Sequence, residues 1–245
     1  MNADSSAKMS ARDTILARVR EALRVPAPLP HLKSHDVLGS ESGRPRAIEI
    51  LPIEVARPWL PDGGETSEER ISILTENLGK LQAIVHRVPD TTAAADLMLV
   101  LARERDWRRV AYHPHPLVEP LLAGVPCATH VVDCGTFDKD TVEACDAGIS
   151  ACESLVAQTG SILVSSRTCG GRALTILPHV HVVVATVEQV VATLGEALQG
   201  VRDRHAGRLP SMLSFITGPS RTGDIERILV LGAHGPRELI VILVG

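Results

Sequence analysis

The spacing of hydrophobic residues predicts helices and strands that alternate along most of the chain. In the segment 67–80, Ile71, Leu74 and Leu78 recur at helical spacing, which predicts an amphipathic helix. Further helices are expected over 91–105 and 117–123. Short apolar runs predict strands over 83–88, 109–112, 129–132, 162–164, 181–185 and 239–244. Strands that alternate with helices of about 10–15 residues are typical of βαβ units, so the pattern predicts an α/β fold with a mostly parallel sheet.

The first 66 residues have a different pattern. A capping sequence at 10–13 and an apolar stripe that includes Ile15, Leu16 and Val19 predict one amphipathic helix, and a segment rich in proline and glycine follows over 25–66. We therefore divide the chain into an N-terminal helix with a Pro-rich arm, 1–66, and one domain, 67–245. A helix isolated by such an arm has to bury its stripe on the main domain or on a second copy, so a homo-oligomer is one expectation.

Composition excludes several classes of function. The formal net charge is −4 and aromatic residues make up 2%, so neither a basic stripe nor stacking platforms favour nucleic-acid binding. Apolar runs are shorter than the roughly 20 residues of a membrane-spanning helix, and the polar N-terminus does not resemble a secretory signal. The five cysteines are an odd number without a Cys-x-x-Cys motif, which favours a reducing, cytoplasmic location and argues against an iron–sulfur cluster in this chain.

Four polar, glycine-rich stretches lie beside the apolar runs, and ligands of open α/β sheets bind beyond the carboxyl ends of the strands. The first, 158–161, joins two runs at hairpin spacing, so it is either an ordinary turn or a turn that approaches a ligand. The second, 165–172, carries glycines, hydroxyls and Arg172, which suit either an anion-binding loop or a solvated loop.

The third and fourth stretches lie near the C-terminus. In 217–224, Ser220 or Thr222 suits the cap of a following helix, whose free amides favour a negative group. This stretch matches neither the phosphate-loop motif nor Gly-x-Gly-x-x-Gly, so no nucleotide site is predicted. In 232–238, His234 is the candidate catalytic residue, because histidine as a residue type can exchange a proton near neutral pH, although a lone loop histidine is more often structural.

Two histidine pairs, His113 with His115 and His179 with His181, have an i, i+2 spacing that can place both side chains on one face of a strand. Neither pair has an evident third ligand, so we expect no metal site. A Gly-x-Ser-x-Gly elbow is also absent from the sequence, which argues against a serine hydrolase.

At these stretches the sequence resembles the lactate utilisation protein C family, the LUD-domain family. The most specific strings are Gly218-Pro219-Ser220-Arg221-Thr222 and His234-Gly235-Pro236-Arg237-Glu238, and the weaker ones are 146–152, 157–161 and 177–181. The resemblance implies a Rossmann-like fold similar to the NagB/RpiA/CoA-transferase group, with helices on both faces of the sheet. It also implies a role beside two iron–sulfur proteins in the oxidation of L-lactate to pyruvate. Many relatives resemble Ala-Glu-Thr-Gly where this chain has Gln158, and glutamine cannot act as a carboxylate base or nucleophile.

Three functions follow as hypotheses. The first is an accessory subunit of a lactate-oxidising system that binds a small anionic ligand or cofactor. The alternatives are a stand-alone enzyme that acts on a sugar phosphate, a CoA ester or a folate-like ligand, and an interaction or regulatory module with a vestigial pocket. We expect the ligand-binding residues to converge on one pocket, and they are Gln158, Thr159, Gly160, Ser161, Arg172, Gly218, Pro219, Ser220, Arg221, Thr222, Asp224, His234 and Gly235.

Overall fold

A computed structural model describes residues 11–22, 24, 61–133, 138–206, 208–223, 229–232 and 234–245. Helix α1 (Ala11–Ala22) belongs to a unit of its own, separate from the body that holds the rest of the described chain. As the periodicity predicts, α1 is amphipathic, and within its unit Ile15, Leu16 and Val19 are exposed. The predicted boundary between residues 66 and 67 stays a prediction.

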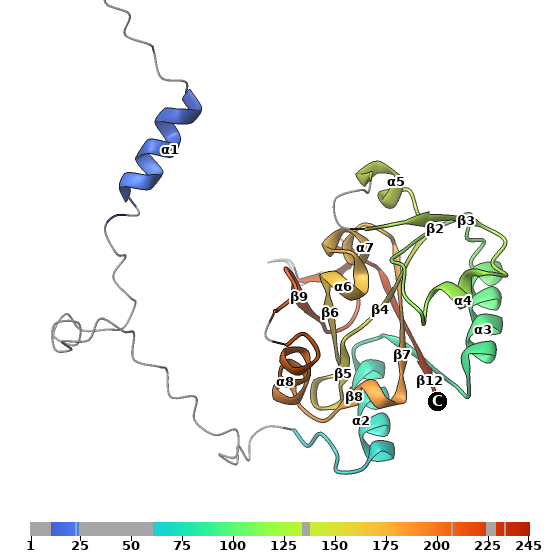
Figure 1. Cartoon of the computed structure of the whole chain (residues 1–245). Coiled ribbons are helices and arrows are strands. Elements are labelled where there is room, and N and C mark those ends of the chain that lie inside the picture. Colours follow the sequence, from blue (N-terminus) through green and yellow to red (C-terminus); the bar gives the residue numbers. More distant parts are fainter. Residues whose placement is uncertain are drawn as a thin grey trace, which may run out of the picture. The chain divides into compact units, whose positions relative to one another are not determined.

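A six-stranded sheet forms the centre of the body (Figure 1). Its strands are β1 (Ile84–Val88), β2 (Arg109–Tyr112), β3 (Ala128–Val131), β4 (Ala147–Ala151), β7 (Val180–Thr186) and β12 (Glu238–Val244). They are hydrogen-bonded in the order β1-β12-β7-β4-β2-β3, and every neighbouring pair is parallel. The α/β fold with a parallel central sheet is therefore confirmed.

Helices cover both faces of this sheet. On one face, α3 (Thr91–Glu104) and α4 (Glu119–Leu122) pack with Met98, Leu101 and Leu121 against Val182 and Ile240. The opposite face meets α2 (Ser67–Lys80), α5 (Lys139–Glu143) and α7 (Arg172–Ile176). Successive side chains of a strand point to opposite faces of the sheet. Because both faces are covered, the buried strands are apolar at consecutive positions.

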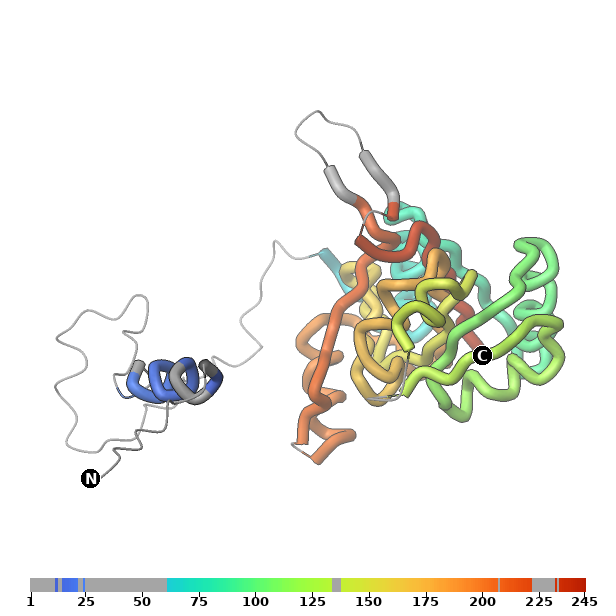
Figure 2. The backbone as a smooth tube through the Cα atoms, turned by 90° about the horizontal axis from the view of Figure 1, so that it is seen from above, coloured from blue at the N-terminus to red at the C-terminus, as the bar shows by residue number. Residues whose placement is uncertain are grey.

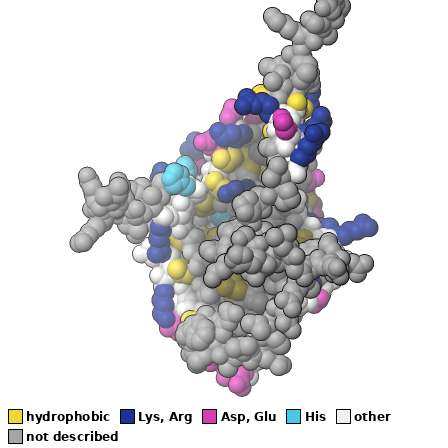
Figure 3. All heavy atoms as spheres, turned by 90° about the vertical axis from the view of Figure 1, so that its left-hand side faces the viewer, with side chains coloured by type: hydrophobic (Ala, Val, Ile, Leu, Met, Phe, Trp, Pro, Cys, Tyr) yellow, Lys and Arg dark blue, Asp and Glu magenta, His cyan; other side chains and the backbone are white. Residues whose placement is uncertain are grey.

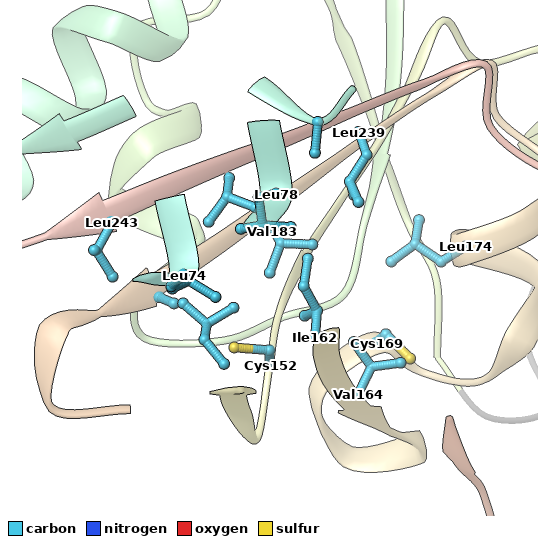
Figure 4. Packing of buried hydrophobic residues seen from close by; sticks show 14 of the residues in the cluster. Leu74, Leu78, Cys152, Ile162, Val164, Cys169, Leu174, Val183, Leu239 and Leu243 are labelled. Atoms are coloured by element: carbon cyan, nitrogen blue, oxygen red, sulfur yellow. The ribbon is translucent and has the colours of Figure 1, made fainter. Parts of the chain in front are cut away.

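The core on the second face is built from aliphatic side chains of distant segments. Leu74 and Leu78 of α2 lie against Val183 and Leu239 of the sheet, and Ile162 approaches from a second sheet (Figure 4). All five side chains have an exposed fraction of 1% or less. Full burial of each such side chain contributes roughly 1.5–3 kcal/mol, so this cluster holds α2 and the second sheet in place.

The second sheet has four strands in the order β8-β5-β6-β9. They are β5 (Ser154–Val156), β6 (Ser161–Ser165), β8 (Val190–Val191) and β9 (Leu213–Ile216). The antiparallel β5–β6 pair, joined by the 3-10 helix η1 (Ala157–Thr159), confirms the predicted hairpin. Helix α8 (Leu194–Arg204) packs its Ala197 and Val201 on this sheet, on the other side of the body from α3 (Figure 2).

Shorter elements complete the body. The connections carry α6 (Ser166–Cys169) and η2 (Val187–Gln189), and β10 (Arg221–Gly223) pairs with β11 (Leu229–Leu231) in an antiparallel ribbon. Exposed hydrophobic side chains on the side of α8 and β9 include Leu194, Leu198 and Phe215, and Figure 3 shows hydrophobic and basic side chains interspersed on this side. Within the described part of the chain, no helix has the length and apolarity needed to cross a membrane.

The two edges of the parallel sheet define where functional groups lie. The amino edge is formed by the residues that precede the strands, such as Leu81–Ala83 before β1, and the carboxyl edge by those that follow them, such as His113 after β2. The connection after β2 passes through α4 on one face, whereas the connection after β4 passes over the opposite face. The carboxyl ends of the neighbouring strands β2 and β4 therefore flank the topological switch point, where open α/β sheets bind ligands.

Candidate functional site

Two of the predicted polar stretches meet through their hydroxyl groups. Antiparallel pairing of β6 with β9 aligns Ile162 with Ile216, so Ser161 at the start of β6 lies opposite Thr217 at the end of β9. The Ser161 and Thr217 hydroxyl oxygens are 2.7 Å apart, and the Thr159 hydroxyl donates to Ser161 over 2.8 Å. Residues 58 positions apart in sequence thus form one chain of three hydroxyls.

The 218–221 loop turns from this point toward the end of α2. Gly218 has a φ of 93°, and a Cβ there would lie 3.1 Å from the Leu81 carbonyl oxygen, so the tight approach and the positive φ favour glycine. The Arg221 guanidinium donates a hydrogen bond to the same Leu81 carbonyl oxygen. This carbonyl lies at the C-cap of α2, where the helix dipole favours a cation.

The loop before β12 completes the group. The Ser220 backbone N–H donates to the Pro236 carbonyl oxygen over 2.8 Å, and a Cβ at Gly235 would lie 3.2 Å from the Ser220 Cβ. The neighbouring His234 is exposed. We call Ser161, Thr217, Ser220, Arg221, His234 and Gly235 the amino-edge cluster.

The amino-edge cluster corrects the expectation that these stretches gather at the carboxyl ends of the strands. Leu81 precedes β1, and Pro236 precedes β12. The Arg237 backbone N–H also donates to the carbonyl oxygen of His179, which precedes β7. The reason for the reversal is that 232–237 leads into β12 of the parallel sheet, whereas 158–160 and 217–220 follow β5 and β9, which belong to the second sheet.

The predicted residue Gln158 is buried in structural contacts. It is 9% exposed, and its side-chain amide donates to the Pro61 carbonyl oxygen over 2.7 Å. Its backbone N–H donates to Ala192, and Asn77 of α2 donates to the Ala157 carbonyl oxygen over 2.8 Å. The adjacent Gly160 has a φ of 62° and lies against Asn77, so the 158–160 turn fixes α2 to the second sheet.

Arg172 lies in a different place. It opens α7 and lines a cavity of about 300 Å³ with Lys139, and the remaining lining residues are apolar, namely Ala173, Ile176 and Leu177. No hydrogen bond or ion pair among the described residues joins Arg172 to the amino-edge cluster, and the convergence of all the predicted residues on one pocket stays a prediction. Pro219 is buried in the 218–221 loop. Asp224 and the side chain of Thr222 lie outside the described residues.

A second polar group occupies the carboxyl edge at the switch point. His113 follows β2, with its Nδ1 2.8 Å from the Val132 carbonyl oxygen and its Nε2 3.1 Å from the Arg167 carbonyl oxygen. A Cβ at Gly170 would lie 2.8 Å from His113 Nδ1, and Gly170 has a φ of 65°, so the backbone after α6 lies directly on the ring. His113 thereby joins the ends of β2 and β3 to α6.

His115 lies two residues further along the same loop and is half-buried. Its Nδ1 accepts a hydrogen bond from the Leu117 backbone N–H over 3.2 Å. Burial lowers the pKa of His115, and the nearby charge of His113 lowers it further, while Glu153 and Glu119 act in the opposite direction. The net effect is a pKa below the ordinary value, so His115 is neutral at physiological pH.

Glu153 follows β4 and is 5% exposed. Its carboxylate accepts hydrogen bonds from Ser165 Oγ at 2.6 Å, His205 Nε2 at 3.0 Å and Arg204 Nε at 3.2 Å. Burial raises the pKa of Glu153, but the hydrogen bonds from Ser165 and His205 and the charge of Arg204 outweigh burial and lower it overall. The buried charge is therefore compensated, as a stable buried carboxylate requires.

Sequence reasoning missed most of this carboxyl-edge group. His113 and His115 were considered only as zinc ligands, and Glu153, Arg204 and His205 were not considered. Among the described residues, no three His, Cys, Asp or Glu side chains gather in a way that could hold a metal ion. The available signal was Glu153 itself, a charged residue directly after the small and apolar segment 147–152.

Another histidine is buried in the central sheet. His181 of β7 is 1% exposed, and its Nε2 is 2.9 Å from the hydroxyl oxygen of Ser150 on β4. Its Nδ1 has no hydrogen-bond partner among the described residues. Burial lowers the pKa of His181 to about 4, so this side chain is a neutral part of the core.

Comparison with known proteins places the chain in a family. Residues 71–244, most of the described body, match the LUD domain. The chain belongs to the LUD-domain family. "Lactate utilization protein C" of Geobacillus kaustophilus is 34% identical to this LUD-domain chain over 202 residues, which are 76% of this chain and 82% of the relative. The protein of the same name from Oceanobacillus iheyensis is 29% identical over 221 residues, which are 84% of this chain and 94% of the relative.

A solved structure agrees with the fold of the LUD domain described above. The crystal structure of a DUF162 family protein from Deinococcus radiodurans has a TM-score of 0.59 and 24% sequence identity. The match covers 74% of this chain and 100% of that structure. At this identity the likeness supports the fold alone.

Proposed function

We propose that this LUD-domain chain is an accessory protein of L-lactate utilisation that works with iron–sulfur proteins in the oxidation of lactate to pyruvate. Its similarity to proteins named lactate utilization protein C, over most of their length, carries the proposal. In this proposal the electrons pass through the partner proteins, and this chain itself carries no iron–sulfur cluster. Of the four described cysteines, Cys169 lies on α6, and Cys127, Cys145 and Cys152 lie in three different connections.

The ligand in this proposal is a small carboxylate held at the amino-edge cluster. Arg221 and His234 are exposed, and the Ser220 backbone N–H donates to the carbonyl oxygen of Pro236, two residues after His234. A guanidinium group and a histidine suit a carboxylate, because hydrogen bonds to charged groups are shorter and stronger than neutral ones. The hydroxyl chain from Thr159 to Thr217 supports the loop, since these hydroxyls already satisfy one another.

The role in lactate oxidation is tested by reconstitution. Full-length protein is combined with its iron–sulfur partners, L-lactate and an artificial electron acceptor, and pyruvate formation is measured. We expect the rate to collapse when this chain is omitted, and the chain alone to be inactive and to contain no stoichiometric iron. An unchanged rate without the chain contradicts the accessory role, and lactate oxidation by the chain alone contradicts the division of roles.

The ligand site is tested by calorimetry with L-lactate and with pyruvate. Arg221→Ala removes a charge-assisted contact worth roughly 1.5–3 kcal/mol, so binding should weaken by about tenfold or more, whereas Arg221→Lys should retain part of it. Arg208→Ala is the matched control, because Arg208 is also exposed and lies outside the cluster. Unchanged binding in folded Arg221→Ala protein contradicts the amino-edge assignment. Preferential binding of a CoA ester or a sugar phosphate contradicts the carboxylate.

A further inference from the structure

We propose that His113 and His115, at the topological switch point, form a second oxyanion site that takes a small carboxylate. His115 would donate a hydrogen bond from Nε2 to the ligand, and His113 would supply a fixed positive charge. This site lies at the opposite edge of the sheet from the amino-edge cluster. It therefore does not depend on the ligand assignment made above.

The contacts of His113 require a particular protonation state. Both of its ring nitrogens face backbone carbonyl oxygens, of Val132 and Arg167, and a carbonyl oxygen can only accept a hydrogen bond. A neutral imidazole has one N–H, so it leaves one nitrogen lone pair against a carbonyl lone pair. Only the imidazolium donates to both oxygens, so the proposed site uses His113 in its protonated form.

The contact of His115 fixes its tautomer. Because Nδ1 accepts the Leu117 backbone N–H, the proton of the neutral ring is on Nε2. Neutral His115 is then a hydrogen-bond donor at Nε2 and not a base. A neutral histidine with a pinned tautomer is suited to polarise or hold an oxygen of a ligand.

The carboxylates near this histidine pair are compensated or screened, so they do not cancel the proposed positive charge of His113. The carboxylates that act on His115 are Glu153, after β4, and Glu119, on α4. Glu153 is compensated by its ion pair with Arg204, at 3.1 Å, and by its contact with His205. Glu119 is exposed, so solvent screens its charge.

The ligand class follows from the donors. One N–H donor beside one cation matches the oxygens of a single carboxylate group, and L-lactate and pyruvate serve as small carboxylate probes. Phosphate is an oxyanion of similar size, so the experiment has to distinguish phosphate binding from carboxylate binding. The position also fits, because parallel α/β sheets bind ligands at such a switch point.

The test uses NMR of the full-length protein with the ring nitrogens of histidine labelled. Without ligand, we expect His115 to be the Nε2–H tautomer and His113 to carry protons on both nitrogens. Titration with pyruvate or L-lactate should then shift the His115 Nε2 signal in a saturable way, while sodium chloride at equal ionic strength and inorganic phosphate should not. The signal of His234 reports separately on the amino-edge cluster in the same titration.

Variants separate binding from structure. His115→Leu should weaken carboxylate binding by roughly tenfold or more, whereas His115→Gln, which retains a donor near the Nε2 position, should weaken it far less. His179→Leu, an exposed histidine at the amino edge, is the matched control. Arg221→Ala should leave the His115 shift unchanged even if it abolishes binding at the amino edge.

Three results would overturn this inference. The first is a neutral His113 or an Nδ1–H tautomer of His115 in wild-type protein. The second is the absence of a saturable His115 shift with either carboxylate, which is informative even if the variants do not fold. The third is a saturable shift with phosphate that equals or exceeds the shift with the carboxylates.

Discussion

Removal of the buried imidazole of His181 should take away part of the acid sensitivity of the fold. Burial lowers the pKa of His181 to about 4, against an ordinary value of 6.5. Above about pH 6.5 the ring is neutral in both the folded and the unfolded chain, so it adds no pH dependence. Between about pH 6.5 and pH 4 the unfolded chain binds a proton that the folded chain does not, and stability falls as the pH falls.

The size of the effect follows from the two pKa values. The full difference corresponds to about 3 kcal/mol, since each pKa unit is equivalent to about 1.4 kcal/mol. At about pH 5, where most of the protonation of the unfolded chain has occurred, the loss relative to about pH 7.5 is about 2 kcal/mol. A loss of this size is large compared with the total stability of about 5–15 kcal/mol that is usual for proteins.

The assay compares urea unfolding of wild-type protein and His181→Gln at about pH 7.5 and about pH 5. Glutamine does not titrate, and it places an amide near the Ser150 hydroxyl, whose oxygen lies 2.9 Å from His181 Nε2 in the wild-type protein. We expect the variant to lose about 2 kcal/mol less than wild type between the two pH values, whatever its stability at neutral pH. His179→Gln, two residues away and exposed, should keep the wild-type pH dependence. Equal pH dependence in wild type and His181→Gln would refute the reasoning.

Three further experiments test how other buried groups contribute to the fold. Gln158→Glu replaces the donor to the Pro61 carbonyl oxygen with a buried carboxylate, so urea unfolding should show a loss of about 1–3 kcal/mol that shrinks at acidic pH as the new carboxyl group is protonated. Gly148→Ala would place a Cβ 2.5 Å from a carbonyl oxygen of α7, so thermal unfolding should show a loss of stability of about 1–3 kcal/mol. Gly79→Ala is the control, because Gly79 has open space around it in α2 and its replacement should be neutral or stabilising. Cys152, buried and with its pKa raised to about 12, should resist alkylation in native protein at about pH 8 and react once urea is added, as read by mass spectrometry of its peptide; rapid labelling of the native thiol would contradict its burial.

Strong periodicity in the sequence accounts for the parts of the fold that could be predicted. The helices α2 and α3 and the strands β7 and β12 follow runs whose apolar spacing fits one type of element, and their observed bounds lie within one residue of the predicted ones. The hairpin of β5 and β6 was also predicted correctly, because the segment between its runs has the length of a turn. In these segments local pattern and tertiary packing favour the same structure.

The strand β4 shows why the carboxyl-edge group was missed. Its sequence, Ala147-Gly148-Ile149-Ser150-Ala151, has small residues and a serine in place of an apolar run, so its pattern did not predict a strand. The structure uses these small residues in the middle of the sheet, where Gly148 leaves room for α7 to pack closely. Without β4 the order of the strands, and hence the switch point beside His113 and Glu153, could not be deduced. Long-range pairing determines this site, and local pattern carries no information about such pairing.

The distance between the two edges determines how the binding experiments can be interpreted. A seven-residue strand such as β12 separates its two ends by roughly 20 Å, far more than the length of a three-carbon acid. One molecule of lactate or pyruvate therefore cannot contact both Arg221 and His115. If Arg221→Ala and His115→Leu each weaken binding, two molecules bind or the two edges are coupled through the sheet. Stoichiometry from calorimetry separates these cases: two sites per chain require two independent contacts, whereas one site affected by both changes would mean that one of the two residues acts through the fold.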